Sequence, residues 1–149
     1  MYCRSLKMFR RESELVLNKI LELSKYRLSK AREELDTSIE LIGIGRFSQS
    51  VNRSYYSIFH AVRALFAIEE VDFKKHSGVI SHFQHNYIKT GKFEKGLSNI
   101  IVTANVIRNQ SDYNDFVVVT KEEASKQVEN AERFLKEMEN YLNVIFNEM

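Results

Sequence analysis

The chain has 149 residues, of which 44% are hydrophobic and 28% charged, so it fits one globular domain and leaves no room for a second. It contains 5 Gly and no Pro, and because these residues punctuate turns, their scarcity disfavours an all-β fold. A formal net charge of +2 is too small for non-specific binding of nucleic acid by the surface as a whole, so any contact with RNA or DNA has to be local.

The sequence contains no membrane or export signal that we can identify. No apolar run approaches the ~20 residues that span a bilayer. The basic residues near the start are followed by Glu12 and Glu14, without the continuous apolar stretch of a signal peptide. We therefore expect a cytoplasmic protein with no membrane partner.

The first helix is predicted over about Ser13 to Ile42, as one long helix or two in series. Apolar residues recur there at steps of three, four or seven, which is the helical period. Gly43 and Gly45 supply the positive φ angles that end the segment, and Ser48 offers an N-cap for the next helix. An antiparallel hairpin follows from this short connection.

The second helix is predicted over about Gln49 to Glu69. Its apolar residues cover more than one face, so it should be the most buried element and the centre of the fold. A shorter helix runs from about Ser77 to Lys89 and ends before Gly91, and a fourth runs from about Leu97 to Ser111.

The last helix opens with a capping box, in which Thr120 and Glu123 satisfy each other's backbone amides. Before it, the apolar and β-branched segment from Phe116 to Val119 is expected to pack as an extended strap. Short connections favour antiparallel neighbours, so the predicted fold is an all-α, up-and-down antiparallel bundle of four to five helices. We expect a single domain, with an N-terminal extension over about 1–25 and a core over about 26–146.

Polar side chains lie along one side of the second helix, among them Arg53, Tyr56 and His60. A buried, unpaired guanidinium is costly, so Arg53 needs solvent, a carboxylate or a phosphate, and a structural salt bridge is the preferred interpretation. His60 lies on an aromatic-rich face and is interpreted as a satisfied core histidine in preference to a catalyst.

Arg108 follows Ala104 by four residues and Ile101 by seven, which places it on the buried stripe of the fourth helix. The simplest structural explanation is an ion pair with Asp112 at the i,i+4 spacing. The functional alternative is that Arg108 opens onto a cleft or a dimer seam, where its planar fork of donors binds a phosphate.

His76 stands at the start of the short helix, where backbone amides stabilise anions. It is either a ligand contact or a helix-capping residue, and the sequence does not separate the two. His82 and His85 follow at spacings of six and three without a nearby cysteine, so we expect no metal site and no cofactor.

Three stretches resemble the HEPN domain family in its stand-alone prokaryotic form: Asn52 to Leu65, His76 to Val79 and Arg108 to Tyr113. The string Arg-Ser-Tyr-Tyr-Ser-Ile-Phe-His in the first is the most specific part, and the resemblance spans about Ser29 to Tyr141. It implies a five-helix, up-and-down bundle that commonly dimerises. Such proteins are often encoded beside a minimal nucleotidyltransferase as a toxin–antitoxin pair.

The resemblance also implies a candidate site. Many members of the family are metal-independent ribonucleases, with an arginine followed by four to six residues and a histidine near the end of the fourth helix. Arg108 matches that arginine, and Asn109 matches the polar residue often found beside it. The histidine positions hold Tyr113, Asn114 and Asp115, none of which titrates near neutrality. An imidazole is available only if the fold brings His60 or His76 beside Arg108.

We therefore expect a HEPN-type helical protein that binds nucleotide or RNA phosphate and partners a nucleotidyltransferase in a toxin–antitoxin-like system. The candidate catalytic residues are Arg108, Asp112 and Tyr113. The candidate binding residues are Arg53, Tyr56, His60, His76 and Asn109. The alternatives are a metal-independent ribonuclease toxin with a degenerate motif, and a non-catalytic structural dimer or scaffold, so enzymatic activity stays open. A homodimer is expected in each case.

Overall fold

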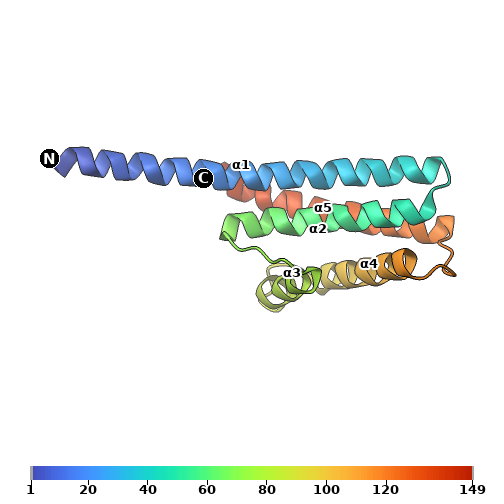
Figure 1. The fold of residues 1–149 in the computed structure, drawn as a ribbon. Helices are drawn as coiled ribbons and strands as arrows, with labels where there is room; N and C mark the ends of the chain where they lie inside the picture. The colour runs from blue at the N-terminus through green and yellow to red at the C-terminus, as the bar shows by residue number, and fades with distance from the viewer. Residues whose placement is uncertain (1, 149) are drawn as a thin grey trace.

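The computed structural model describes the backbone of residues 2–148 and the side chains of residues 5–148, and these ranges contain helices but no strand. The elements are α1 (Tyr2–Gly43), α2 (Phe47–Glu69), α3 (His76–Phe83), the π-helical turn η1 (Gln84–Ile88), α4 (Lys95–Tyr113) and α5 (Lys121–Glu148). The four long helices alternate in direction, and α3 crosses between α2 and α4 at one end (Figure 1). The predicted all-α, up-and-down bundle is confirmed.

The first helix is a single helix that begins at Tyr2, eleven residues before the predicted start. The prediction was wrong because it followed the buried stripe, whereas the helix continues wherever nothing breaks it. Residues 5–16 are all exposed, and α1 projects beyond the bundle in this region (Figure 1). Gly45 has the expected positive φ of 75°, whereas Gly43 is the last helical residue and is not among the glycines with positive φ.

The second helix begins at Phe47, with Arg46 in the N-cap position, so the predicted N-cap at Ser48 was wrong. The turn is closed by two backbone hydrogen bonds instead. The amide of Arg46 donates to the carbonyl of Leu41 at 2.8 Å, and the amide of Gly45 donates to the carbonyl of Ile42 at 3.1 Å. These bonds reverse the chain before Ser48 is reached.

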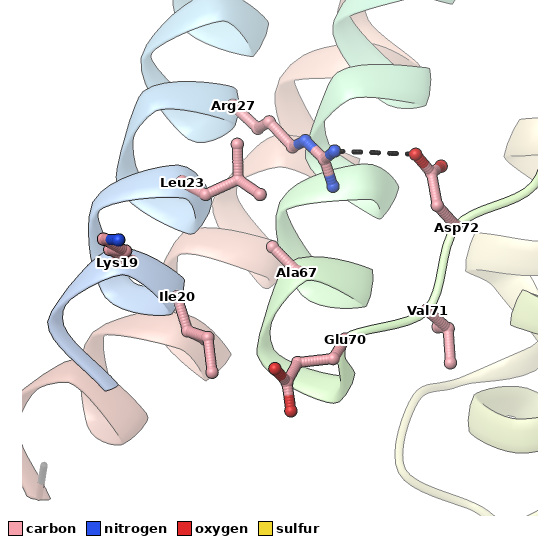
Figure 2. Close-up of a pocket in the computed structure, with 8 residues that line it drawn as sticks. All are labelled: Lys19, Ile20, Leu23, Arg27, Ala67, Glu70, Val71 and Asp72. Atoms are coloured by element: carbon pink, nitrogen blue, oxygen red, sulfur yellow. Dashed lines mark ion pairs between the residues drawn. The ribbon is translucent and has the colours of Figure 1, made fainter. Parts of the chain in front are cut away.

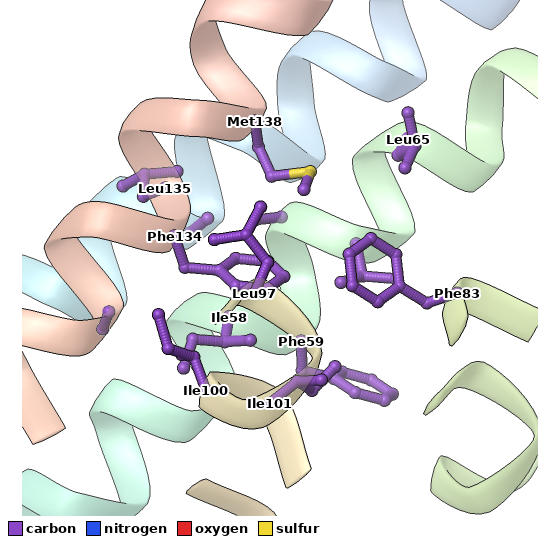
Figure 3. Close-up of a cluster of buried hydrophobic side chains, with 14 of the residues drawn as sticks. Ile58, Phe59, Leu65, Phe83, Leu97, Ile100, Ile101, Phe134, Leu135 and Met138 are labelled. Atoms are coloured by element: carbon purple, nitrogen blue, oxygen red, sulfur yellow. The ribbon is translucent and has the colours of Figure 1, made fainter. Parts of the chain in front are cut away.

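The core is centred on α2, as predicted. Large α2 side chains are almost completely buried and meet residues of α3, α4 and α5 in one cluster (Figure 3). Members of that cluster are Ile58, Leu65, Phe83, Leu97, Ile101, Phe134 and Met138. Burial of this kind is the main force that holds the helices together, and it fixes the α2 face that turns toward α4.

The predicted short helix is divided at Phe83 into α3 and η1. At this point the side chain of Asn86 donates to the carbonyl of His82 at 3.2 Å. The backbone widens by one residue, so the amide of Lys89 bonds to the carbonyl of Gln84 at 3.0 Å. Gly91, with φ of 76°, ends the segment as expected.

The capping box at the start of α5 is confirmed by reciprocal bonds of 3.1 Å between Thr120 and Glu123. The expected strap was wrong in part, since Val119 is buried but Phe116 is 95% exposed. The side chain of Asn114 accepts the amide of Phe116 and starts a tight turn, which directs the Phe116 ring away from the core. Nowhere in the described residues does a helix combine the length and apolar character needed to cross a membrane.

Candidate functional site

Arg108 lies in the second half of α4 and is only 8% exposed, which confirms its predicted place on the buried stripe. Its guanidinium carbon lies 4.4 Å from the ring centre of Tyr55 and 5.8 Å from that of Tyr56. Both rings come from α2. Their faces attract the cation and exclude water from it, so the charge sits in a medium where electrostatic interactions are strong.

The polar partners of Arg108 leave part of its donor capacity unused. One terminal nitrogen donates to Asn105 Oδ1 at 3.1 Å, and the other lies 3.6 Å from Asp112 Oδ2. The predicted pair with Asp112 is therefore present as a single long contact. The Nε atom is buried and has no acceptor among the described residues. A guanidinium can form two parallel hydrogen bonds to one carboxylate or phosphate. Arg108 forms no such pair of bonds, so its hydrogen-bonding capacity is only partly used.

Asn52 ties the carboxylate of this site to α2. Its side-chain amide donates to Asp112 Oδ2 at 3.1 Å, so that oxygen faces both Asn52 and Arg108. On α4, Asn109 donates to Asn105 Oδ1 at 3.5 Å. The site is consequently built by two helices, with amides as the connecting groups.

His76 reaches the same site through Tyr55. Its Nδ1 lies 2.9 Å from the Tyr55 hydroxyl, and its ring stacks on Phe59 at 4.3 Å between centres. Burial raises the pKa of Tyr55 to about 12, against the opposing effect of Arg108. Burial, and then the charge of Arg108, lower the pKa of His76.

These shifts define the protonation of the Tyr55–His76 pair at neutral pH. The phenol is protonated and the imidazole is neutral, so one of the two groups donates to the other across the 2.9 Å contact. In the tautomer in which the Tyr55 hydroxyl donates to Nδ1, the imidazole proton lies on Nε2 and is available to a ligand.

His60 lies on the side of Tyr56 that faces α1. Its ring is half-buried against Tyr56 and Phe59, at the edge of the core. Burial lowers the pKa of His60; the charge of Glu34 opposes this shift, and nearby cations add to it. Both histidines share a ring contact with Arg108, His60 through Tyr56 and His76 through Tyr55, but of the two only His76 hydrogen-bonds to a tyrosine that Arg108 stacks on.

Arg53 is the second arginine against Tyr56, with its guanidinium carbon 5.1 Å from the ring centre. Its Nη1 donates to both carboxylate oxygens of Glu34, at 3.1 and 3.2 Å. The interpretation of Arg53 as a structural salt bridge is therefore confirmed.

Tyr113 is not brought to Arg108. It is 81% exposed at the end of α4, and a separation of five residues turns it to another face of the helix. Sequence reasoning missed Tyr55, Asn105 and Asn52. Asn105 was detectable, since it precedes Arg108 by three residues on the same face, whereas Tyr55 had been assigned to the core and Asn52 requires the α2–α4 packing to be known.

Two hollows adjoin the site. One of about 430 Å³ is lined by Asn52, Arg53 and Asp112, among others, and one of about 470 Å³ by Phe59 and His76, among others. A third, of about 330 Å³, lies at the far end of α2 beside Ala67 and Glu70 (Figure 2). No group of three or more His, Cys, Asp or Glu side chains in the described part of the chain is arranged to hold a metal ion.

Comparisons with known proteins identify the family of the chain. The family model of the HEPN domain matches residues 24–141. A "UPF0332 protein" of Thermotoga maritima is 33% identical over 123 residues, which cover 83% of this chain and 93% of that protein.

Two relatives come from Methanocaldococcus jannaschii. "Putative toxin MJ0142" is 34% identical over 129 residues, covering 83% of this chain and 88% of that protein. "Putative toxin MJ0605" is 29% identical over 126 residues, which cover 85% of this chain and 88% of that protein. The resemblance predicted from the sequence is thereby confirmed: the chain belongs to the HEPN domain family.

Proposed function

We propose that this chain is a toxin-like RNA-binding protein in which Arg108 holds a phosphate of the RNA backbone. The observation that carries the proposal is the state of Arg108: buried, stacked on two tyrosine rings, and left with an unused buried donor. A phosphate supplies the planar pair of acceptors that the single long contact with Asp112 lacks. Two relatives that carry the word toxin in their names support the toxin-like part.

His76 and Asn109 complete the proposed phosphate site. In the tautomer that carries its proton on Nε2, His76 offers a neutral donor, and the side-chain amide of Asn109 lies beside Arg108 through Asn105. The hollows on either side of the site allow a strand to enter and leave, which favours RNA over a single nucleotide. We further propose a cytoplasmic homodimer that acts beside a nucleotidyltransferase partner.

The binding test compares Arg108→Gln with Arg133→Gln, an exposed arginine on α5 that is also paired with a carboxylate. Binding of a fluorescein-labelled, mixed-sequence 12-nucleotide RNA is followed by anisotropy. We expect Arg108→Gln to weaken binding at least tenfold, because a charge-assisted pair is worth about 1.5–3 kcal/mol, and Arg133→Gln to leave it unchanged. Equal affinities for all three proteins would remove Arg108 from the site.

A ribonuclease is the second candidate, favoured by the Tyr55 contact that Arg108 and His76 share. In this reading Arg108 stabilises the charge that develops on the phosphate. Asp112 accepts the proton of the ribose 2′-hydroxyl, and His76 gives a proton to the leaving 5′ oxygen from its protonated form, which the lowered pKa makes a minor fraction at neutral pH and a larger one in acid. Cleavage of the 12-mer in the presence of a chelator, and its loss in His76→Gln, would support this activity; intact RNA with the purified wild type rejects it.

The partner and the dimer have their own tests. Co-purification with the product of an adjacent nucleotidyltransferase reading frame supports the partner, and a mass of one chain by light scattering at micromolar concentration contradicts the homodimer.

A further inference from the structure

The central helix exposes only one narrow stripe. Between Val51 and Ala67, every residue of α2 is buried except five that are half-buried. These five are Asn52, Arg53, Tyr56, His60 and Arg63. The last four recur at steps of three and four and Asn52 precedes Tyr56 by four, so all five lie on one side of the helix, and none of them is acidic. This face lies between the groove toward α1 and the groove toward α3.

The positive charge beside this stripe exceeds the negative charge that balances it. Arg27 and Arg63 both contact one oxygen of Asp72, at 3.8 and 3.1 Å, so two guanidiniums share one carboxylate. Figure 2 shows Arg27 reaching from α1 across the end of α2 toward Asp72. In addition, the Nε atom of Arg63 is buried and has no acceptor among the described residues.

Two lysines add to this excess. Lys30 and Lys74 each line a hollow that also contains Arg63. Lys30 lies 3.7 Å from Glu33, but this pair is exposed and contributes little. Glu34 is already engaged by Arg53. The region therefore carries unneutralised cations, although the whole chain has a net charge of only +2.

Arg63 lines both hollows, and one of them reaches His76, a residue of the Arg108 site. The hollow between α1 and α2, of about 420 Å³, contains Lys30 and His60. The hollow between α2 and α3, of about 470 Å³, contains Phe59 and His76, and His76 contacts Tyr55 beneath Arg108. The first of these hollows also contains Tyr26, which is 60% exposed and lies beside Lys30, so an accessible aromatic ring stands among the cations.

We propose that Lys30, His60, Arg63 and Lys74, here called the α2 outer tract, bind the backbone of the same RNA strand beyond the phosphate held by Arg108. This inference rests on the proposed function. From Arg53 to Arg63 the stripe extends about 15 Å at 1.5 Å per residue, which is long enough for more than one phosphate. Cationic grooves with interleaved aromatic rings are the usual way to hold single strands without sequence preference. An acidic protein segment would use the cations but not the aromatic rings.

The test compares two lengths of RNA. A trinucleotide occupies the Arg108 site alone, whereas a 12-nucleotide oligouridylate also reaches the α2 outer tract. We expect the double variant Lys30→Gln/Arg63→Gln to weaken 12-mer binding about tenfold and to leave trinucleotide binding unchanged. The slope of log affinity against log salt should fall by about 1.4, or about 0.7 for each lost phosphate contact on a single strand.

The control is Lys126→Gln/Lys136→Gln, which removes the same charge from exposed positions on α5. Because Arg63→Gln also removes a bond to Asp72, the single variant Lys30→Glu is measured against Lys126→Glu, where no buried contact is lost. We expect Lys30→Glu, but not Lys126→Glu, to weaken 12-mer binding.

The outcomes separate the two proposals. If Arg108→Gln weakens the 12-mer while the tract variants match their controls, the tract is overturned and the Arg108 site stands. Wild-type protein that binds neither RNA overturns both. A third outcome is that polyglutamate binding depends on the tract residues and 12-mer binding does not. That result assigns the surface to an acidic protein and overturns its role in RNA binding.

Discussion

Two arginines lie against the same tyrosine ring, and the protein treats them differently. Arg53 is 5.1 Å from the centre of Tyr56 and Arg108 is 5.8 Å from it. The Arg53 side chain is 37% exposed and has a carboxylate at 3.1 Å, whereas the Arg108 side chain is 10% exposed and has its carboxylate at 3.6 Å. The exposed arginine is neutralised, and the buried one is left short of partners.

This difference is the reverse of what stability alone would select. Desolvation makes an unpaired charge costly, so the closer carboxylate would be more valuable at Arg108. A ligand that supplies the missing acceptors gains from a cation that has already lost its water and is held in place by two rings. The comparison therefore supports the proposal that Arg108 is the arginine that binds phosphate, whereas Arg53 is held in a structural ion pair.

The largest expected effect is on folding stability, and it separates a phosphate site from a buried ion pair. Arg108→Ala removes the contacts with both tyrosine rings and should lower the free energy of unfolding by about 2 kcal/mol. Asp112→Ala should cost less than about 1 kcal/mol, because the pair is long and partly exposed. Urea unfolding measures both. Equal losses would favour the scaffold interpretation, in which the pair fixes helix register.

The second effect concerns the shape of the cation. Lysine keeps the charge but cannot form two parallel bonds, so Arg108→Lys should weaken binding of the 12-nucleotide RNA about tenfold. Arg53→Lys keeps its ion pair with Glu34 and should change affinity less than about twofold. Anisotropy titrations at one fixed salt concentration give both values. A larger loss of RNA affinity for Arg53→Lys than for Arg108→Lys would make Arg53 the binding arginine and Arg108 the structural one.

A smaller effect is expected when the neutralising carboxylate is removed. Glu34→Gln releases Arg53 from its ion pair and should strengthen RNA binding about threefold, as one more phosphate contact becomes available. Glu137→Gln, on the exposed face of α5, makes the same change in net charge and serves as the control. An identical gain in both variants would trace the effect to net charge rather than to Arg53.

The smallest effect is on the two histidines. Arg108 lowers the pKa of His76. Arg53 lowers the pKa of His60, but its effect is the smallest among the cations that do so. Removing Arg108 should therefore raise the pKa of His76, and removing Arg53 should raise that of His60 by less. Both pKa values should remain below about 6.5, because burial is the larger cause of each shift. NMR titration of the imidazole protons measures the changes.

The same shifts set the pH dependence of folding. Both folded-state pKa values lie below the unfolded value of about 6.5, so the unfolded chain binds more protons in this range. The stability contributed by the neutral imidazoles is complete above that pH and is lost as the pH falls below it. His60→Gln should make the melting temperature less sensitive to acid, and an unchanged slope would contradict the assignment.

Much of the fold followed from periodicity because the core is made of long, regular apolar stripes. The capping box and the buried position of Arg108 depend only on neighbours within seven residues along the chain, so they were predictable. The π-helical turn at Gln84 was not, because a change of one residue in the hydrogen-bond spacing leaves no mark in the apolar period. The exposed ring of Phe116 was missed since hydrophobicity does not show which way a turn directs a side chain.

The candidate site was predictable only where its members share a helix. The Arg108–Asp112 pair follows from the i,i+4 spacing, but the Tyr55–His76 bond joins residues 21 positions apart. Choosing His76 over His60 required knowing how α3 packs against α2. Tyr113 was proposed from its number in the sequence, and helical geometry turned it away.

The projection of α1 has a consequence for how the molecule opens. The first half-buried side chain in the described part of this helix is Leu17, and the first buried one is Ser24, whose hydroxyl bonds to the carbonyl of Ala64. A stretch of a dozen exposed helical residues is marginal in water by itself. Amide hydrogens of residues 5–16 should therefore exchange through local fraying, and those beyond Ser24 only when the bundle unfolds. The helix α1 is geometrically continuous, but its exposed N-terminal part unfolds at a lower free energy than the part that is packed in the bundle.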